Sequence, residues 1–487
     1  MARTNNNENF PQYLRVMTHI QDKIRDGEWT YGKKLPSQRA LAEEFNVNRT
    51  TIVHALEELK ASGILESKPG SGTYVSNQNW SDISNQVIDW DTISQYSFHA
   101  GSPRTIRKIN DLETDATMIQ LGKGELHSSL FPTKTFRESI ANVSESFHLS
   151  GYDDGKGDFH LREVLSFRLQ EQGIHYSSSS ILIVSGALQA LQLISMGLLQ
   201  QGTYVYLEQP SYIYSLQVFR SLGMHLKGIP YVSGELDVRY LENQIRANKK
   251  PSMLYLNPTF QNPTTKTMSW KNKQEVLTLA NAYQLPIIED DIYRDIWLDR
   301  EAEPSLASMD DGDHVLRIGS FSKTVAPSLR IGWIAGPEDV IQKLGDLRMQ
   351  TDYGSSALPQ IAMHDFLVSG KYDEHLSFLR KQVLKRRDFM VQLVSLHLGD
   401  WVEWEVPEGG MFLWLTFSSD VNVKKLFTEA IRRGVLINPG YIYSPYNNQN
   451  VRLSYVSSSF QKIEAGIIIL REIIKAMERS NYRSCFS

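Results

Sequence analysis

The chain has 487 residues, of which 41% are hydrophobic and 22% charged, and its formal net charge is −4 at pH 7. This length predicts two or three folded units, and the near-average composition excludes fibrous and intrinsically disordered classes. The charge excludes a protein that binds nucleic acid through bulk charge alone, since residues 1–76 carry ten Lys or Arg against nine Asp or Glu.

Cysteine content and apolar runs bear on the compartment. The single cysteine, Cys485, has no partner for an internal disulfide, which fits a reducing cytoplasm. The N-terminus is polar and has no apolar core of a signal peptide. Residues 181–199 are uncharged over the length of a membrane span, but Ser185, Gln189 and Gln192 interrupt them. A buried strand followed by a buried helix is the better interpretation, so we expect a cytoplasmic protein without membrane association.

The first unit, expected at residues 1–76, begins with a pattern of three helices. Tyr13, Met17, Ile20 and Ile24 recur at helical spacing. Ser37 can cap a short helix at residues 38–45. After a tight turn, Asn48 can cap a third helix, and its buried stripe is expected at Ile52, Ala55, Leu56 and Leu59.

Two short strand patterns follow, at residues 64–67 and 73–75, and a Pro/Gly loop joins them. Helices followed by a hairpin predict a winged helix-turn-helix, whose third helix enters the major groove of DNA. Arg49 could then read a guanine edge or grip phosphate, and Thr50 and Thr51 could contact phosphate or a thymine methyl group. The alternative is a small module that serves as a protein-interaction cap.

Three motifs in this unit resemble the GntR family of bacterial repressors: LPSQRALA at residues 35–42, NRTT at 48–51 and GSGTYV at 70–75. The resemblance covers roughly residues 10–76 and implies binding to a double-stranded DNA operator. The DNA-contacting residues that it implies are Arg39, Asn48, Arg49, Thr50, Thr51 and the wing at Gly70. Lys33, Lys34 and Lys68 are weaker candidates for phosphate contacts.

Residues 77–115 are expected to link the two units. They show no clear period, but they contain many apolar side chains, among them Trp80, Trp90 and Phe98. A free linker would not keep so many apolar groups in water. We therefore expect at least the second half of this segment to pack on the large unit, while the first half lets the DNA-binding unit reach a half-site.

The large unit, expected at residues 116–487, alternates strand-like and helical patterns. Apolar runs at residues 181–184, 203–207, 253–256, 286–289 and 315–319 each end at polar, Gly or Pro residues. This rhythm predicts an α/β fold with a mostly parallel sheet and helices on both faces. Ligands in such folds bind at the carboxyl ends of the strands, so the residues that follow each run are the candidates for a site.

Lys323 follows the last of these runs and is the candidate for covalent chemistry. It lies in Ser320-Phe321-Ser322-Lys323, and Arg330 comes seven residues later. A lysine near other cations in a pocket loses its proton easily and can form a Schiff base with an aldehyde. Hydroxyls and a forked guanidinium suit a phosphate dianion. The spacing therefore indicates an aldehyde that carries a phosphate, as in pyridoxal 5'-phosphate (PLP).

Other strand ends add residues suited to the same cofactor. Ser185-Gly186-Ala187 opens a helix whose first amides are a natural phosphate seat. Tyr212 could stack on a pyridine ring. Asp290 could keep the pyridine nitrogen protonated, and Asn262 and Tyr293 could hydrogen-bond the ring hydroxyl. Any one of these is more often structural, but their order before the Ser-x-Ser-Lys string favours a single site.

Together these residues resemble fold-type I PLP enzymes, the aspartate aminotransferase group, over roughly residues 118–480. By that resemblance Lys323 is the covalent attachment point, Asp290 pairs with the ring nitrogen, and Tyr212 stacks on the ring. Asn262 and Tyr293 hold the ring oxygen. The phosphate ligands that it implies are Ser185, Gly186, Ala187, Ser320, Ser322, Arg330 and, from a neighbouring subunit, Tyr152. Arg452 matches the arginine that clamps a substrate carboxylate, and Gly124 lies where the family lines its substrate side.

A GntR-like unit followed by an aminotransferase-like unit resembles the MocR-type regulators over the whole chain. The resemblance implies a domain-swapped homodimer that uses PLP to sense a small amino compound and alters transcription. The chain departs from the enzymes at Ala187, Leu188 and Thr265, where Thr265 stands in place of a usual glycine.

Two alternatives stay open beside the regulator. One is a working aminotransferase whose DNA-binding unit is accessory, and Lys323, Asp290 and Arg452 do not separate it from a sensor. The other is a regulator that senses PLP alone, which Arg452 argues against because PLP offers it no carboxylate. The winged helix favours the regulator, since an enzyme has no need of Arg39 and Arg49 in that frame.

Overall fold

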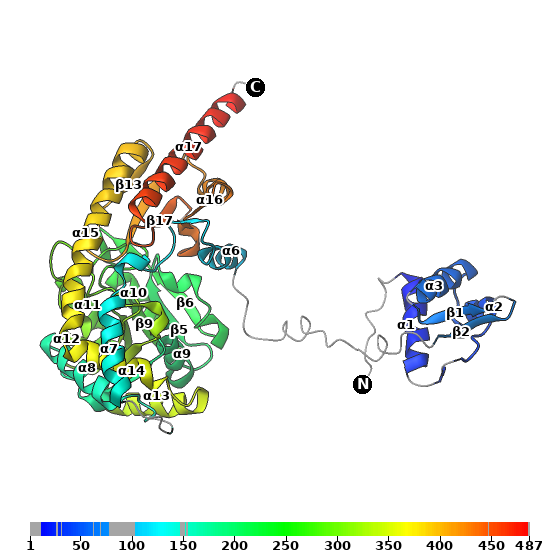
Figure 1. Ribbon diagram of the computed structural model, residues 1–487, viewed down its shortest axis with the longest axis horizontal. Helices are drawn as coiled ribbons and strands as arrows, with labels where there is room; N and C mark the ends of the chain where they lie inside the picture. The colour runs from blue at the N-terminus through cyan, green and yellow to red at the C-terminus, as the bar shows by residue number, and fades with distance from the viewer. Residues whose placement is uncertain are drawn as a thin grey trace. The chain divides into compact units, whose positions relative to one another are not determined.

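The computed structural model describes residues 11–25, 28–30, 32–61, 63–68, 70–76, 103–146, 151, 154–446 and 448–485. The chain divides into two compact units, residues 1–97 and 98–487, both drawn in Figure 1. None of the helices in the described ranges is long and apolar enough to cross a membrane.

The first unit is a winged helix-turn-helix, as predicted. Its elements are α1 (Gln12–Arg25), α2 (Gln38–Glu44), α3 (Arg49–Ala61), β1 (Leu65–Lys68) and β2 (Gly72–Val75). The side chain of Ser37 accepts a hydrogen bond from the Ala40 amide at 3.2 Å, and Asn48 accepts one from Thr51 at 2.7 Å. Both predicted caps are therefore confirmed, and they fix where α2 and α3 begin.

A compact apolar core holds these elements together. The predicted stripe of α3 is buried, together with Ile20, Ile24 and Leu41 from the other two helices. Strands β1 and β2 pair antiparallel, with Leu65 opposite Val75. Gly70 lies in the turn between them with a φ of +72°, in the left-handed region that favours glycine.

The second unit is built on a seven-stranded sheet with the strand order β4-β12-β11-β10-β9-β5-β6. The strands are β4 (Ile181–Val184), β5 (Tyr204–Glu208), β6 (His225–Ile229), β9 (Ser252–Leu256), β10 (Ile287–Asp290), β11 (Val315–Ser320) and β12 (Gly332–Ala335). Only β12 runs antiparallel to its neighbours in this sheet. The five predicted strands are present, and the mostly parallel α/β fold is confirmed.

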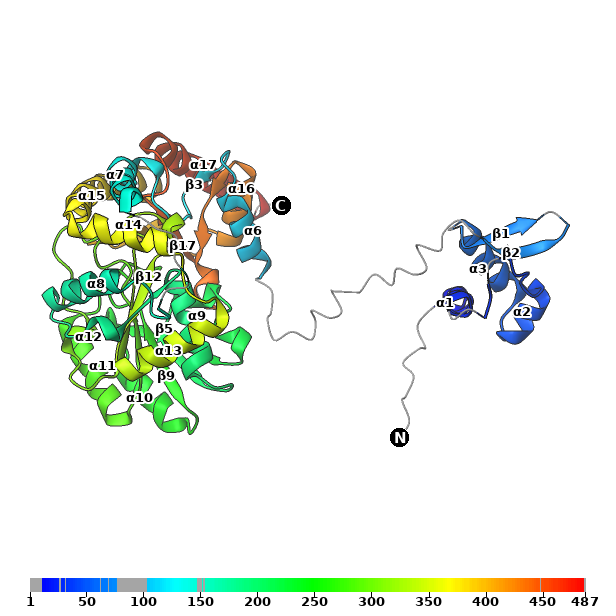
Figure 2. The same ribbon diagram turned by 60° about the horizontal axis from the view of Figure 1, so that its bottom comes forward.

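Each face of this sheet packs against its own apolar core because successive side chains of a strand point to opposite faces. Ile181 and Ile183 belong to one core, and Leu182 and Val184 belong to the other. The first core includes residues of α8 (Phe159–Glu171), α11 (Trp270–Tyr283) and α14 (Ala357–Val368), and the second includes residues of α9 (Ala187–Leu198) and α13 (Glu338–Thr351). Figure 2 shows these helices around the sheet.

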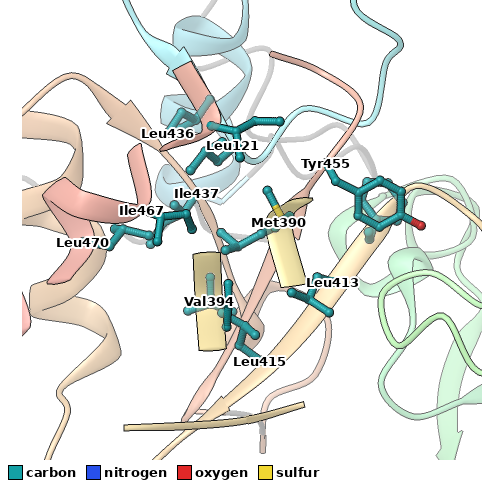
Figure 3. Close-up of a cluster of buried hydrophobic side chains, with 14 of the residues drawn as sticks. Leu121, Met390, Val394, Leu413, Leu415, Leu436, Ile437, Tyr455, Ile467 and Leu470 are labelled. Carbon is teal, nitrogen blue, oxygen red and sulfur yellow. The ribbon is translucent and has the colours of Figure 1, made fainter. Parts of the chain in front are cut away.

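A third core belongs to what we call the C-terminal part, whose four-stranded sheet has the order β13-β14-β17-β16. Its elements are β13 (Val402–Trp404), β14 (Phe412–Phe417), β15 (Val435–Leu436), β16 (Asn438–Pro439), β17 (Asn450–Ser454), α15 (Lys371–Leu398), α16 (Val423–Arg432) and α17 (Phe460–Cys485). Figure 3 shows Leu413 and Leu415 of β14 close to Met390 and Val394 of α15.

The C-terminal part also takes in residues from the start of the unit. Helix α6 (Arg104–Glu113) packs Ile106 and Ile109 into this third core, and β3 (Ile119–Gln120) pairs parallel with β15. In both views α6 lies beside α16 (Figures 1 and 2). The expectation that the second half of the 77–115 segment packs on the large unit is confirmed for residues 103–115. The helix itself was missed, although Ile106, Ile109 and Leu112 recur at helical spacing.

The second unit contains three further helices, a small hairpin and several single helical turns. The other helices are α7 (Thr133–Ser146), α10 (Val238–Ala247) and α12 (Leu306–Met309), and a small hairpin pairs β7 (Tyr231–Val232) with β8 (Glu235–Leu236). Single helical turns occur at Ser128–Leu130, Ser178–Ser180, Tyr212–Ser215, Arg220–Leu222, Pro327–Leu329 and Gly440–Ile442.

Candidate functional site

The predicted site residues meet at the carboxyl ends of the parallel strands, where β17 of the C-terminal part reaches them. Asp290 ends β10, Asn262 follows β9, and Lys323 follows β11. Arg452 on β17 donates from Nη1 to Asn262 Oδ1 at 2.7 Å, and Asn262 donates from Nδ2 to the Tyr293 hydroxyl at 3.1 Å. The fold therefore brings together side chains that lie far apart in the sequence.

Lys323 is held at the inner edge of this site. Its Nζ donates to the carbonyl of Gly124 at 2.7 Å. Burial lowers the pKa of the Lys323 amine, Glu125 partly opposes this, and Arg452 lowers the pKa further. From the sequence we expected neighbouring cations to lower the pKa of Lys323. The pKa is lowered, but burial is a larger cause than the nearby Arg452. A lysine with a lowered pKa is more often neutral and therefore nucleophilic.

Asp290 has one bonded oxygen and one free oxygen. The Tyr255 hydroxyl donates to Oδ2 at 2.6 Å, while Oδ1 is buried and meets no hydrogen-bond donor among the described residues. Burial raises the pKa of Asp290 to about 6, and the bond from Tyr255 offsets part of that rise. A buried carboxylate oxygen without a donor is costly unless a ligand supplies one. The protonated nitrogen of a pyridine ring would supply it.

The charge on Asp290 should appear in the pH dependence of stability. We expect Asp290→Asn, without added cofactor, to be more stable than wild type by a margin that grows as the pH rises from about 4 to 6. The folded pKa of about 6 lies above the unfolded value, so the folded protein holds a proton that the unfolded chain has lost. The margin should grow by about 3 kcal/mol between acidic and neutral pH. Urea unfolding of both proteins across this range measures it, and a pH-independent margin would contradict the assignment.

Arg452 is buried and bonded on two sides. Besides the bond to Asn262, Nη2 donates to the Gly122 carbonyl at 2.7 Å, and the guanidinium lies over the Phe412 ring at 3.8 Å from its centre. Its Nε is buried and has no hydrogen-bond partner within the described part of the chain. A fixed, partly unsatisfied guanidinium is suited to an incoming carboxylate.

The expected phosphate seat lies between β4, α9 and the turn after β11. Gly186 has a φ of +91°, and a Cβ added there would stand 2.9 Å from Nη2 of Arg330. Arg330 donates to the Ser185 carbonyl. The Ser322 hydroxyl is buried with no hydrogen-bond partner among the residues described, whereas the Ser320 hydroxyl donates to the Ile331 carbonyl at 3.2 Å. An unpaired hydroxyl, an arginine and a glycine cradle at a helix N-terminus fit a phosphate.

Three further residues were predicted to belong to the site, namely Tyr212, Gly124 and Tyr152. The Tyr212 amide donates to the Asn262 carbonyl at 3.1 Å, which holds Tyr212 at the site. Gly124 faces inward, since a Cβ there would lie 3.3 Å from Phe412 and 3.8 Å from Nζ of Lys323. Tyr152 lies outside the described residues. Thr265, which stands in place of the usual glycine, has a φ of +60°. The backbone at this position is therefore in the left-handed region that favours glycine.

The sequence missed the residues that support the site from behind. Tyr255 holds Asp290, and Gly122 holds Arg452. The buried Glu208 accepts from the Asn257 amide at 2.7 Å, and Asn257 in turn accepts from the Asn262 amide at 2.7 Å. The only signal for Glu208 and Asn257 was their position at strand ends, which many structural residues share, and Tyr255 lies within β9 like any core aromatic residue.

In the first unit, the predicted DNA-contacting residues Arg49, Thr50 and Thr51 lie at the beginning of α3, whereas Arg39 lies in α2 and Gly70 in the turn of the hairpin. Arg49 donates from Nε and Nη2 to Gln38 Oε1 at 3.3 and 3.2 Å, so α2 holds its guanidinium. The hydroxyls of Thr50 and Thr51 donate to Asn48 Oδ1 at 2.9 and 2.7 Å. Arg39 forms an exposed pair with Glu43, with Nε and Oε1 3.5 Å apart.

Two family models match the chain, one for each unit. Residues 12–75 match the bacterial regulatory proteins of the gntR family, and residues 116–466 match aminotransferase class I and II. Among solved structures, the second unit is similar to a kynurenine aminotransferase from Pyrococcus horikoshii, with 29% identity and a TM-score of 0.73 over 79% of this chain and 98% of that one. A multiple substrate aminotransferase from Thermococcus profundus gives 28% identity and a TM-score of 0.75 over 81% of this chain and 100% of that one.

Relatives of the whole chain carry both units. The HTH-type transcriptional regulator YdfD of Bacillus subtilis is 45% identical, over 96% of this chain and 97% of the relative. The HTH-type transcriptional regulator NorG of Staphylococcus aureus is 39% identical, over 91% of this chain and 99% of the relative. The chain therefore belongs to the MocR-type family of GntR transcription regulators, in which a DNA-binding winged helix-turn-helix is fused to an aminotransferase-like domain.

Proposed function

We propose that this transcription regulator binds PLP covalently at Lys323 and uses it to sense a small amino compound that carries a carboxylate. The observation that supports this best is the convergence of a lysine of lowered pKa, a carboxylate oxygen without a donor and a buried arginine at one end of the sheet. Reaction of the aldehyde with an amine is the chemistry that PLP supplies when it is bound.

Different residues of the chain would bind different parts of the cofactor. Asp290 would hold the ring nitrogen, Asn262 and Tyr293 the ring oxygen, and Tyr212 one face of the ring. Lys323 would be the attachment point. The phosphate would take the free hydroxyl of Ser322, the guanidinium of Arg330 and the amides at the beginning of α9, as the unpaired groups there support. The hydroxyls of Ser185 and Ser320 are already bonded to other groups, so we assign them smaller shares.

Arg452 would select the effector, because it can fork two hydrogen bonds onto a carboxylate. An amine that reacts at the Lys323 side and an acid group that reaches Arg452 define an amino acid or a close analogue. We propose a domain-swapped homodimer as the working form, with Tyr152 reaching the partner's phosphate seat. The two winged helices would then bind the half-sites of one operator, and the effector would bias the balance between two states of the regulator.

A titration tests the sensing function directly. PLP-loaded protein is mixed with DNA from upstream of its own gene, and a panel of amino acids, and of amines without a carboxylate, is added. The expected result is a change in DNA affinity with one or a few amino acids and none with the amines. A response to PLP addition alone, with none to any amino compound, would favour the regulator that senses PLP itself.

Arg49 should carry DNA affinity. Arg49→Ala is expected to weaken binding to upstream DNA by about 1–3 kcal/mol, because α2 holds its guanidinium where a bidentate contact with a guanine edge can form. Mobility-shift titrations measure the loss, and the absorption of bound PLP should stay unchanged. Arg15→Ala, on the exposed side of α1, is the matched control. Equal affinity of Arg49→Ala and the control would refute the placement of the recognition helix.

A catalytic aminotransferase with an accessory DNA-binding unit is the second candidate. It is favoured by Lys323, Asp290 and Arg452, which an enzyme of this fold would need in the same places. Incubating PLP-loaded protein with an amino acid and an oxo acid distinguishes the two functions. Sustained release of the new oxo acid over many turnovers would support the enzyme, and its absence beside a DNA response would support the sensor.

A further inference from the structure

Residues 114–124 connect the candidate site to α6, which is the first helix that the structure describes after the DNA-binding unit. Two of its carbonyls accept hydrogen bonds from the groups that the proposed function assigns to cofactor and effector. Lys323 Nζ donates to the Gly124 carbonyl, and Arg452 Nη2 donates to the Gly122 carbonyl, both at 2.7 Å. Covalent attachment at Nζ, or a carboxylate on Arg452, competes for these donors.

The bond between Lys323 and Gly124 also crosses between two parts of the unit. Lys323 follows β11 of the seven-stranded sheet, whereas Gly124 follows β3, which is paired with β15 of the C-terminal part. Leu121 fixes this segment to the C-terminal part, since it is fully buried and lies near Leu436 and Ile437 in Figure 3. Its amide donates to the Leu436 carbonyl at 2.9 Å.

Gln120 connects this segment to α6. Its Nε2 donates to the carbonyl of Leu112 at 2.9 Å, in the last turn of α6, and to that of Asp115 at 3.3 Å. The Gln120 carbonyl accepts hydrogen bonds from the hydroxyls of Ser457 and Ser458. One side chain therefore fastens the end of α6 to the strand that leads into the site.

We propose that Gln120 is a coupling residue: it transmits the release of the Gly122 and Gly124 carbonyls to α6, and thereby to the segment that leads to the winged helix. The inference rests on the proposed function, since it needs Lys323 and Arg452 to be engaged by ligands. A ligand can bias the DNA-binding state only through a difference in its interactions with two states, and these two hydrogen bonds provide that difference.

The charge at the end of α6 supports this route. Glu113 is the last residue of α6, and burial raises the pKa of its carboxyl while Arg452 lowers it. The charges of Arg452 and Glu113 therefore attract each other. A carboxylate bound at Arg452 would weaken that attraction. Effector binding would therefore act on the end of α6 both through charge and through the hydrogen bond from Gln120.

Hydrogen exchange with PLP alone as the probe tests the first half of the proposal. Attachment of PLP to Lys323, followed by borohydride labelling, is expected to change the exchange rates of amides in α6 and in residues 119–125 by about fivefold or more, since that is the lower end of typical coupling between two sites. Attachment without any change there would overturn this inference and leave the proposed function standing. No attachment would overturn both.

The second half is tested with Gln120→Met, which keeps the size of the side chain and removes its donor. The variant should still attach PLP, but it should lose the PLP-induced change of exchange rates in α6. It should also lose most of the change in DNA affinity that the effector causes in wild type, which we expect to be about fivefold or more. Gln449→Met is the matched control, since it removes a similar bond, from Nε2 to the Ser418 carbonyl at 2.9 Å, elsewhere in the C-terminal part. If Gln120→Met behaves like the control, Gln120 has no coupling role.

Discussion

Lys323→Ala is expected to abolish covalent attachment of PLP while the protein stays folded. The visible absorption that appears when wild-type protein is mixed with PLP should be absent, and borohydride should leave no label on the variant in a mass spectrum. The reason is that Nζ of Lys323 is a buried amine of lowered pKa at the end of the sheet where Asp290 Oδ1 and Ser322 Oγ are buried without hydrogen-bond partners among the described residues. Loose, non-covalent binding of PLP should persist, because the phosphate and ring contacts do not depend on the amine.

The control for this prediction is Lys343→Ala, which removes an exposed lysine from α13 and should label like wild type. Circular dichroism and the unfolding midpoint check that Lys323→Ala has not simply unfolded. A variant that is still labelled to the wild-type extent would place the reactive amine elsewhere. The covalent part of the proposed function would then be wrong, whatever the DNA-binding unit does.

Much of the fold could be predicted because local patterns and global structure agree in it. The caps at Ser37 and Asn48 are short-range signals that specify a helix start by themselves, and the structure forms both. The buried parallel strands are apolar runs bounded by polar residues, which is how a sheet covered on both faces appears in a sequence. Strand-end positions then indicated which polar residues would meet.

The parts that escaped prediction depend on long-range contacts. Helix α6 is stabilised by the core that Ile106 and Ile109 enter, and its polar face gives little signal in a segment interpreted as a linker. Tyr255 lies inside a buried strand and resembles a core aromatic until Asp290 is placed beside it. Backbone carbonyls such as that of Gly122 carry no sequence signal, so the hydrogen bond that holds Arg452 was not predictable.

The site is not built for maximal stability. Asp290 Oδ1, Ser322 Oγ and Arg452 Nε are buried without hydrogen-bond partners in the part of the chain that the structure describes. Each such group costs about 1–3 kcal/mol relative to a satisfied one. Such a cost persists where a ligand later supplies the missing partners. Ligand binding should therefore raise the stability of the second unit, since a ligand that binds only the folded state stabilises it.

Arg452→Ala is expected to weaken the response to amino acids roughly tenfold to a hundredfold, since a charged hydrogen-bonded pair contributes about 1.5–3 kcal/mol. The guanidinium is buried, and Asn262 and Gly122 fix its direction, so a carboxylate finds it already oriented. The variant should still bind DNA, because Arg452 belongs to the second unit and the DNA contacts belong to the first. Titration of amino acids into the PLP-loaded variant, followed by absorption and by mobility shift, measures both quantities.

Arg452→Lys separates the fork from the charge. A lysine keeps the positive charge but offers a compact ammonium group, so it should recover only part of the affinity that a bidentate contact provides. Simple amines without a carboxylate should affect wild type, Arg452→Ala and Arg452→Lys alike, because none of them uses the fork. If amines shift the wild-type spectrum as well as amino acids do, or if Arg452→Ala responds normally, Arg452 is not the carboxylate clamp. The effector would then be recognised by its amine alone, and the carboxylate part of the proposed function would be wrong.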